Sequence, residues 1–236
     1  MPSLIEVKNL KYRYASNPHD TLFIPEFKIE KGERVYLYGP SGSGKTTFLE
    51  VLAGILKVEQ GEVKILDQSL GNMSEKARDH FRAEHVGYIF QSFNLIPYLS
   101  VRENIELPIH LSFSRRERLK GEDTLEVIKQ LCSRLGIERL LDKNVTELSV
   151  GQQQRVAVAR ALCGRPDFIL ADEPTSSLDM DHRERFLQLM FELCEQYGTT
   201  VLFVSHDRSI QHLFSRSVSL ESINIAAHSA TMTKGG

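Results

Sequence analysis

Residues 39–46 read Gly39-Pro40-Ser41-Gly42-Ser43-Gly44-Lys45-Thr46 and fit the pattern G-x-x-x-x-G-K-[ST] at every fixed position. A strand-like run, 34–38, precedes them, and a helical pattern, 46–53, follows them. This context is typical of a phosphate-binding loop, in which glycines let successive backbone N–H groups face phosphate oxygens at a helix N-terminus. A loop that is merely flexible would not require Lys-Thr directly before an apolar helix.

The side chains of this loop have distinct expected tasks. Lys45 is expected to reach the β- and γ-phosphates of a nucleotide. The hydroxyl of Thr46 is expected to bind Mg²⁺, which bridges two phosphate oxygens. We expect the whole segment from Gly39 to Thr47 to contact the nucleotide.

Two acidic residues form a second candidate site. The apolar run 168–171 is followed by Asp172 and Glu173, at the end of a strand where open α/β sheets bind ligands. Buried strands rarely end in paired acids for packing reasons. We expect Asp172 to hold Mg²⁺ and Glu173 to orient and deprotonate the water that attacks the γ-phosphate. The alternative, a surface turn opened by Pro174, is disfavoured by the phosphate loop elsewhere in the chain.

Composition narrows the remaining classes of function. The 236 residues are 41% hydrophobic, and a net charge of −2 gives no global attraction to nucleic acid or anionic lipid. The spacing of Cys132, Cys163 and Cys194 favours reduced thiols over a disulfide framework or a zinc site. No apolar run approaches the roughly 18 residues of a membrane span, and the N-terminus lacks the features of a signal peptide. We therefore expect a cytosolic protein.

Hydrophobic periodicity predicts an N-terminal β layer followed by interleaved strands and helices. Strand-like runs cover 5–10, 21–29, 34–38, 62–66, 86–90, 167–171, 199–204 and 217–220. This interleaving favours a largely parallel sheet covered on both faces. Between 91 and 165 the pattern turns helical, with helices expected over 115–135 and 151–162. It indicates a helical subdomain inserted into the core.

The run Leu148-Ser-Val-Gly-Gln152 precedes the second of these helices, and Ser149 with Gln152 forms a capping box that would suffice for a structural helix start. The run also resembles the signature sequence of ATP-binding-cassette (ABC) ATPases, usually Leu-Ser-Gly-Gly-Gln. Three more segments resemble that family's Q-loop, D-loop and switch histidine, namely Gln91, Ser176–Asp179 and His206. Together with the phosphate loop and the acidic pair, these ordered motifs cover most of the chain.

The resemblance implies an α/β fold, with a P-loop NTPase (RecA-like) core, an N-terminal antiparallel β layer and an inserted α-helical subdomain. In a single ABC ATPase domain, the core and its β layer are expected over 1–91 and 166–222. The helical subdomain is expected over 92–165 and a flexible tail over 223–236.

The resemblance also implies the cofactors and the catalytic residues. ATP and Mg²⁺ are the cofactors, and the reaction is ATP hydrolysis. His206 would touch the γ-phosphate and Gln91 would sense Mg²⁺ and the attacking water, beside Glu173 and Lys45. Taken singly, His206 could be a surface residue at a helix start and Gln91 a polar strand end. The implied Mg²⁺ ligands are Thr46, Gln91 and Asp172.

In this family each ATP lies between two chains, so the resemblance implies a head-to-tail homodimer. The phosphate loop of one chain would face the signature helix of the other. Ser149, the N–H groups of Val150 and Gly151, and the helix dipole would form a second anion site, with Gln152 and Asp179 among the nucleotide contacts. Val150 replaces a signature glycine and would be strained if the backbone needed a positive φ.

Adenine is expected to stack on an aromatic residue of the first β layer. Tyr12 and Tyr14 share one face of an extended strand, so periodicity does not choose between them. Spacing from Asn9-Leu10 resembles the family's A-loop better for Tyr14. Both could equally be packing residues of an edge strand.

Residues 90–108 resemble the lipoprotein-release and macrolide-export subfamily (LolD-like and MacB-like ATPases). An apolar cluster lies there, where an ABC ATPase meets the cytoplasmic helix of its membrane permease, and core packing would account for each of its side chains equally well. The cluster consists of Phe93, Leu95, Ile96, Tyr98 and Leu99.

The implied partners are integral membrane permease subunits, which would hold the ATPase at the cytoplasmic side of the inner membrane. Through the permease, a periplasmic adaptor or outer-membrane channel is a further implied partner. The alternative is a division-associated ATPase that signals across the membrane without export. A soluble ABC ATPase of DNA repair or translation is disfavoured, because the sequence shows no coiled-coil insertion, second cassette or basic patch, and we expect no nucleic-acid partner.

Overall fold

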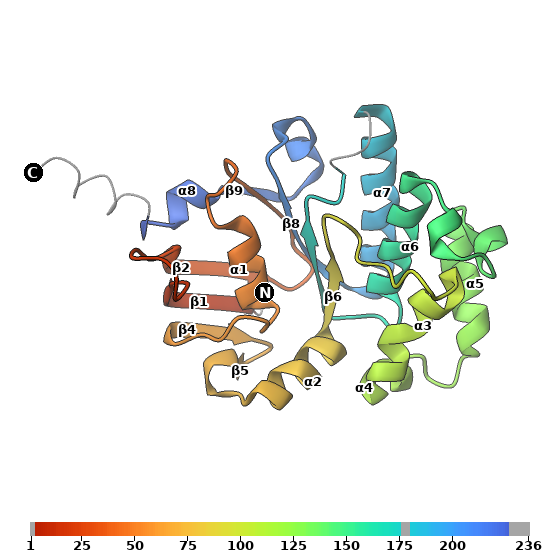
Figure 1. Ribbon diagram of the computed structural model, residues 1–236, viewed down its shortest axis with the longest axis horizontal. Helices are drawn as coiled ribbons and strands as arrows, with labels where there is room; N and C mark the ends of the chain where they lie inside the picture. Colours follow the sequence, from red (N-terminus) through yellow and green to blue (C-terminus); the bar gives the residue numbers. More distant parts are fainter. Residues whose placement is uncertain (1–2, 176–179, 227–236) are drawn as a thin grey trace, which may run out of the picture. The chain divides into compact units, whose positions relative to one another are not determined.

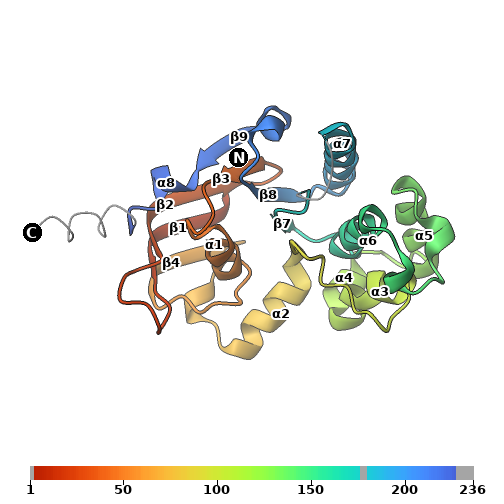
Figure 2. The ribbon, with the colours of Figure 1, turned by 45° about the horizontal axis from the view of Figure 1, so that its top comes forward.

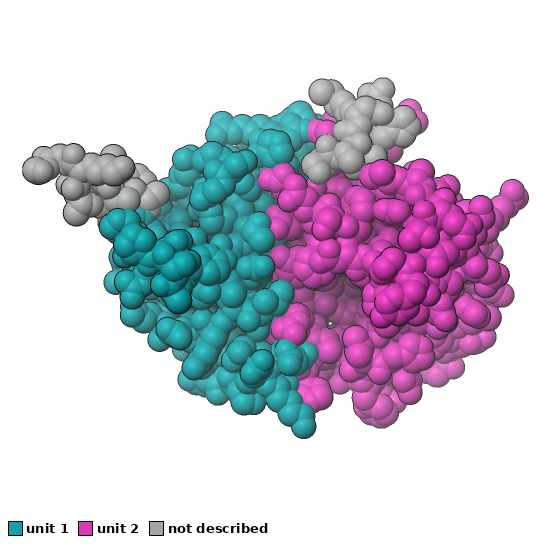
Figure 3. All heavy atoms as spheres, in the orientation of Figure 1, with its two compact units in different colours: residues 1–79, 202–236 teal, residues 80–201 magenta. Residues whose placement is uncertain are grey.

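The computed structural model describes residues 3–175 and 180–226, and the side chains of 180–182 are not described (Figure 1). The chain forms two compact units, which Figure 3 shows in different colours. Unit 1 comprises residues 1–79 and 202–236, and unit 2 comprises residues 80–201. The predicted division into a core and an inserted helical subdomain stays a prediction.

Unit 1 contains an antiparallel sheet with the strand order β2-β1-β4-β5. Its strands are β1 (Ser3–Tyr12), β2 (Leu22–Glu30), β4 (Gln60–Ile65) and β5 (Gln68–Ser69). One close approach requires glycine, because a Cβ on Gly61 would lie 2.2 Å from the carbonyl oxygen of Asn9. This sheet is the predicted N-terminal β layer.

The apolar face of the antiparallel sheet packs beside α1 (Lys45–Leu52), as Figure 1 shows. Phe27 of β2 meets Phe48 of α1 edge to face, with 5.4 Å between the ring centroids. Such a pair contributes about 0.5–1.5 kcal/mol beyond the area it buries. This packing fixes the helix that follows the phosphate loop.

Three strands lie side by side in unit 1 in the order β8, β3, β9 (Figure 2). They are β3 (Arg34–Tyr38), β8 (Thr200–Ser205, which belongs to unit 1 from residue 202) and β9 (Arg216–Ser219). β3 and β9 run parallel, with Val35 opposite Arg216 and Tyr38 opposite Ser219. The remaining elements of unit 1 are η1 (Leu70–Asn72), the start of α2 (Glu75–His85), η4 (Arg208–Leu213) and α8 (Leu220–Ile223).

Unit 2 pairs two parallel strands, β6 (Val86–Ile89) and β7 (Phe168–Asp172), with a set of helices. The longer helices are α3 (Val101–Leu111), α5 (Thr124–Arg134), α6 (Val150–Leu162) and α7 (Met180–Tyr197). The short ones are α4 (Phe113–Glu117), η2 (Glu138–Leu140) and η3 (Val145–Glu147). Antiparallel and parallel sheets with interleaved helices confirm the predicted fold class.

The single helix predicted over 115–135 is wrong. The chain forms α4 and α5 there, separated by residues 118–123. Lys120 and Gly121 both have a left-handed backbone, with φ of 53° and 80°, so no α-helix continues through them. Asp123 then caps α5, because its side chain accepts a hydrogen bond from the N–H of Leu125.

The buried side chain of Arg115 anchors α4 to neighbouring segments of unit 2. It is 1% exposed, and its guanidinium donates to the carbonyls of Glu84, Val86 and Cys163. Burial lowers its pKa to about 10, so the group remains charged at neutral pH. A charged residue in the predicted helix thus serves as a buried connector between α4, β6 and the end of α6.

Candidate nucleotide-binding site

The backbone of the phosphate loop has the turns that its glycines predict. Gly42 and Gly44 lie in the left-handed region, with φ of 79° and 98°, and Gly44 is the N-cap of α1. A Cβ on Gly39 would come within 2.9 Å of the Ser43 hydroxyl oxygen. The N–H of Ser43 donates to the carbonyl of Pro40 at 3.2 Å, which closes the turn. The loop therefore leads from β3 into the N-terminus of α1 as expected.

The side chain of Lys45 reaches back over the phosphate loop. This side chain is buried, and its Nζ donates to the carbonyls of Gly39 and Pro40, both at 2.9 Å. The ammonium is thus held beside the backbone that would cradle phosphates. Thr46 follows at the start of α1 and is exposed.

Tyr14, rather than Tyr12, reaches the helix that follows the phosphate loop. Its hydroxyl lies 3.1 Å from the Thr47 hydroxyl and donates to Glu50 at 3.5 Å. Tyr14 follows β1, whose last residue is Tyr12, and the two rings meet edge to face at 5.1 Å. Burial and the neighbouring Tyr14 raise the pKa of Tyr12. This contact ties Tyr14 to the helix after the phosphate loop, and its role as the adenine platform stays a prediction.

Asn224 supports the phosphate loop from the far end of the chain, which the sequence did not predict. It is 3% exposed, although it lies in the segment 223–236 for which a flexible tail was expected. Its Nδ2 donates to the carbonyls of Thr21 at 3.0 Å and Ser43 at 3.4 Å, and its Oδ1 accepts from the N–H of Phe23 at 2.8 Å. Residues 227–236 lie outside the described residues, so the prediction for them stays a prediction.

His206 directly follows the buried strand β8 and is exposed. The next residue, Asp207, is anchored on both sides. Its N–H donates to the Ser205 hydroxyl at 3.1 Å, and its carboxylate accepts from the N–H of Ser209 at 2.9 Å, which caps η4. The histidine is therefore carried on a well-braced turn of unit 1.

In unit 2 the acidic pair lies where the sequence predicts it. β7 is buried throughout and ends at Asp172, which is 6% exposed. Glu173 follows with φ of 45°, a left-handed backbone that is uncommon for a residue with a side chain. Such strain costs about 1–3 kcal/mol and is concentrated at functional sites. It turns the chain sharply at the residue predicted to be the catalytic base.

Gln91 emerges at the same edge as the acidic pair. Because β6 and β7 run parallel and Ile89 is opposite Ala171, Gln91 and Glu173 each lie two residues beyond the last pair. The turn after Gln91 is also left-handed, at Phe93 and Asn94. Their carbonyls accept hydrogen bonds from Arg160 of α6 at 2.6 and 2.7 Å, which holds this turn.

The signature segment forms the start of α6. Ser149 is its N-cap in a capping box, with the N–H of Gln152 donating to the Ser149 hydroxyl at 3.4 Å and Gln152 Oε1 accepting from the N–H of Ser149 at 3.0 Å. Val150 is the first helical residue and is not among the residues with positive φ, so its branched side chain causes no backbone strain. It is 53% exposed.

The fold of unit 2 does not require a glycine at position 151. The φ of Gly151 is not positive, and a Cβ there would meet nothing within 4 Å. A glycine in the first turn of a helix leaves the backbone N–H groups uncovered, which suits the approach of an external anion.

The predicted D-loop residues Ser176–Asp179, with the nucleotide contact Asp179, lie outside the described residues.

Gln154 is a second residue that the motifs did not indicate. It is fully buried in α6, and its Nε2 donates to the carbonyl of Pro174 at 2.7 Å. Pro174 directly follows the strained Glu173. No local sequence signal distinguishes Gln154 from its neighbours Gln152 and Gln153.

The residues predicted to bind Mg²⁺ fit that ion chemically. A threonine hydroxyl, an aspartate carboxylate and a glutamine amide supply the hard oxygen ligands that Mg²⁺ prefers. They are Thr46, Asp172 and Gln91. Among the described residues, no group of three or more His, Cys, Asp or Glu side chains could hold a metal by itself. The phosphate oxygens of a nucleotide would complete the coordination.

The apolar cluster after Gln91 is divided in the structure. Phe93 is 7% exposed and belongs to the core, whereas Tyr98 is 79% exposed. Leu95, Ile96 and Leu99 are half-buried. Within the described part of the chain, no helix has both the length and the apolar character needed to cross a membrane.

The fold, the phosphate loop and the acidic pair at the end of a buried strand define a P-loop nucleotide-binding protein. Comparison with known families matches residues 23–176 to the ABC transporter family. The chain belongs to this family and is an ABC transporter ATP-binding domain.

Relatives and solved structures agree with this assignment. The chain is 42% identical over 210 residues to the "Uncharacterized ABC transporter ATP-binding protein YbbA" of Escherichia coli K12, covering 87% of this chain and 89% of YbbA. It is 34% identical to the "Lipoprotein-releasing system ATP-binding protein LolD" of Francisella tularensis, covering 88% and 89%. A dimeric post-hydrolysis structure of the ATP-binding cassette MJ0796 with ADP and Pi has a TM-score of 0.77 and 35% identity, covering 91% of this chain and 93% of that one.

Proposed function

We propose that this chain hydrolyses ATP in a site shared by two identical chains and thereby drives a membrane permease of the lipoprotein-release or macrolide-export type. In each site, the phosphate loop and the Asp172-Glu173 pair of one chain bind the nucleotide. The signature helix of the other chain closes over the γ-phosphate. Family membership implies ATP hydrolysis.

The observation that carries the proposal is the edge at which Gln91, Asp172 and Glu173 emerge. A buried carboxylate at the strand end suits Mg²⁺, and the adjacent strained glutamate suits a base that must hold one orientation. A water between the carboxylate of Glu173 and the γ-phosphate would lose its proton to Glu173 as it attacks phosphorus, and ADP would leave. Lys45 and His206 would stabilise the charge that develops on the γ-phosphate oxygens.

The signature helix supports the second half of the site. Its first turn has a capped N-terminus, an uncovered glycine and the positive end of the helix dipole. The dimeric structure of the similar cassette MJ0796 gives a precedent for two copies in one assembly. ATP would therefore join the two chains, and its hydrolysis would release them.

The role in transport is supported by the similarity to LolD, whose name places it in a lipoprotein-releasing system. The exposed Tyr98 and the half-buried Leu95, Ile96 and Leu99 offer an apolar surface for a permease helix. This contact would hold the ATPase at the cytoplasmic face of the inner membrane.

Replacing Glu173 by Gln tests the catalytic assignment. Glu173→Gln removes the base but keeps the shape of the side chain, so ATP binding should persist while turnover falls by about 10²–10⁴-fold. The matched control is Glu195→Gln, an exposed carboxylate on α7. Hydrolysis by Glu173→Gln at the rate of the control would refute the assignment of the base.

Replacing Ser149 by Arg tests the contribution of the second chain. Ser149→Arg should abolish hydrolysis and leave nucleotide binding to the isolated chain intact, because that chain keeps its own phosphate loop. Ser133→Arg, an exposed substitution on α5, controls for the added charge. A comparable loss of binding by the isolated Ser149→Arg chain would contradict a shared site.

A further inference from the structure

The strand that leads into the phosphate loop carries a buried tyrosine that the proposed mechanism does not use. Tyr36 lies in β3, three residues before Gly39, and its side chain is 0% exposed. A buried tyrosine hydroxyl needs a hydrogen-bond partner, because leaving it without one costs free energy. Here the hydroxyl donates to the backbone carbonyl of Asp207 at 2.6 Å. Asp207 is the residue after His206.

The ring of Tyr36 is packed against three other aromatic rings, which restrict the movement of its hydroxyl. It packs against Phe214 with 5.0 Å between ring centroids, against Tyr38 with 6.0 Å and against Phe203 of β8 with 6.2 Å. Phe203 and Phe214 also contact each other, with 5.3 Å between centroids. These contacts lie within unit 1. They leave the Tyr36 ring little freedom to move its hydroxyl away from Asp207.

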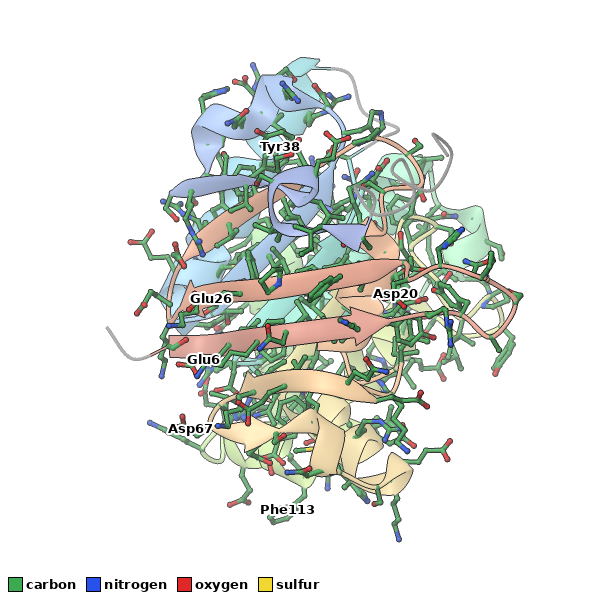
Figure 4. The ribbon with its side chains drawn as sticks, turned by 90° about the vertical axis from the view of Figure 1, so that its left-hand side faces the viewer. Glu6, Asp20, Glu26, Tyr38, Asp67 and Phe113 are labelled. Carbon is green, nitrogen blue, oxygen red and sulfur yellow. The ribbon has the colours of Figure 1, made fainter. Side chains whose placement is uncertain are left out.

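The same strand contacts the turn after His206 at a second point. The guanidinium of Arg208 lies 4.6 Å from the centroid of the Tyr38 ring, in a cation–π contact. Tyr38, labelled in Figure 4, is half-buried. Among the described residues, no hydrogen bond is formed by the hydroxyl of Tyr38. The two tyrosines of β3 therefore differ in the role of their hydroxyl groups.

We propose that Tyr36 is a positioning residue for His206. β3 leads into the phosphate loop, and the hydroxyl of Tyr36 ties that strand to the backbone carbonyl of Asp207, the residue after His206. Together with the hydrogen bonds of Asp207 and the contact of Arg208 with Tyr38, this bond limits how far the turn that carries His206 can move relative to the phosphate loop. Loss of the hydroxyl removes the tie to β3, so the turn opens more often and His206 leaves its position at the γ-phosphate more often. The inference rests on the role of His206 in the proposed function.

The substitution Tyr36→Phe tests this role, with Tyr38→Phe as the matched control on the same strand. Both keep the ring and remove only a hydroxyl. We expect Tyr36→Phe to lower kcat by about 10-fold with KM changed by less than about 2-fold, because misplacement of a catalytic group affects the chemical step more than binding. Tyr38→Phe should keep the parent kcat. Equal kcat values for the two variants would overturn the proposal.

A double-mutant cycle tests whether Tyr36 acts through His206. In a His206→Ala background, Tyr36→Phe should change the single-turnover rate by less than about 2-fold, because the residue that it positions is gone. A full and equal loss in both backgrounds would overturn the proposal. If His206→Ala alone hydrolyses ATP at the parent rate, the role of His206 in the proposed function fails instead.

Hydrogen exchange provides a readout that does not depend on hydrolysis. In nucleotide-free protein, the amides of residues 207–209 should exchange about 10-fold faster in Tyr36→Phe than in Tyr38→Phe, because the turn opens more often. Unchanged exchange at these amides would overturn the bracing role whatever His206 does. Faster exchange with unchanged kcat would overturn the catalytic consequence.

Discussion

Gln154 and Pro174 are joined by a 2.7 Å hydrogen bond between the side-chain amide of α6 and the backbone carbonyl that follows Glu173. The bond connects the helix that begins at the signature segment to the turn that carries the predicted catalytic base. In a dimer, that helix would contact the nucleotide bound by the partner, whereas Glu173 would act on the nucleotide bound by its own chain. The bond therefore links two sites within one chain.

Gln154→Leu should impair hydrolysis by loosening this turn. The substitution keeps the volume but leaves the Pro174 carbonyl without its donor, so Glu173 should lose its fixed orientation. We expect kcat to fall by about 10–100-fold with little change in ATP affinity. The same replacement at exposed Gln130 of α5 is the control. Steady-state kinetics that do not distinguish the two variants would count against a role for the Gln154 bond.

Asn224→Leu should weaken the fold of unit 1. The substitution removes hydrogen bonds to the backbone of Thr21, Phe23 and Ser43 and leaves these partly buried groups without the Asn224 side chain as partner. Each such group costs about 1–3 kcal/mol, so the midpoint of urea unfolding should fall clearly. Glu221→Gln, an exposed change in α8, should leave it unchanged. An unaltered midpoint in Asn224→Leu would show that these bonds do not stabilise the fold.

Tyr14→Ala should weaken ATP binding more than Tyr12→Ala does. Base stacking on an aromatic ring contributes about 1–3 kcal/mol, which corresponds to a 5- to 150-fold loss in affinity. Tyr14→Phe keeps the ring and should bind nearly as well as the parent. Titration with a fluorescent ATP analogue measures all three variants. A larger loss in Tyr12→Ala would move the adenine platform to Tyr12.

Asp167 should make stability depend on pH in the acid range. Burial raises the pKa of its carboxyl, but the hydrogen bond from His85 at 2.7 Å and the charge of Arg118 at 2.8 Å outweigh burial and bring it below the ordinary 3.8. A lowered pKa in the folded state means that the stabilisation is present above the ordinary value and is lost as the pH falls through the lowered one.

Asp167→Asn should accordingly be less stable than the parent by about 1–3 kcal/mol at pH 7, with the difference shrinking at acid pH. Urea unfolding at several pH values measures this difference. A difference that stayed constant down to the acid range would show that the charge of Asp167 is not what stabilises the fold.

The motifs predicted the fold and much of the candidate site because they are local in sequence. The left-handed φ of Gly42 and Gly44 and the capping box of Ser149 and Gln152 follow from residue type and spacing alone. The end of β7 at Asp172 was also visible as a change from apolar to acidic residues.

The missed features depend on contacts between distant segments or on single turns. Asn224 bonds to Phe23, 201 residues away, and Tyr36 bonds to Asp207, 171 residues away, so no local pattern indicates either pair. The break between α4 and α5 depends on the left-handed Lys120, a conformation that its residue type does not favour, and on the left-handed Gly121, whose residue type does favour it. The helical and charged character of 115–135 therefore did not reveal the break, although Gly121 was a local signal for it.

The most direct test of the shared site is size-exclusion chromatography of Glu173→Gln with ATP, with and without the second substitution Ser149→Arg. Glu173→Gln should retain ATP, and it should therefore elute as a dimer when ATP is present and as a monomer when it is absent. Glu173→Gln/Ser149→Arg should bind ATP and still elute as a monomer, because the partner's half of the site is blocked. A double variant that dimerises with ATP as fully as Glu173→Gln would contradict the account.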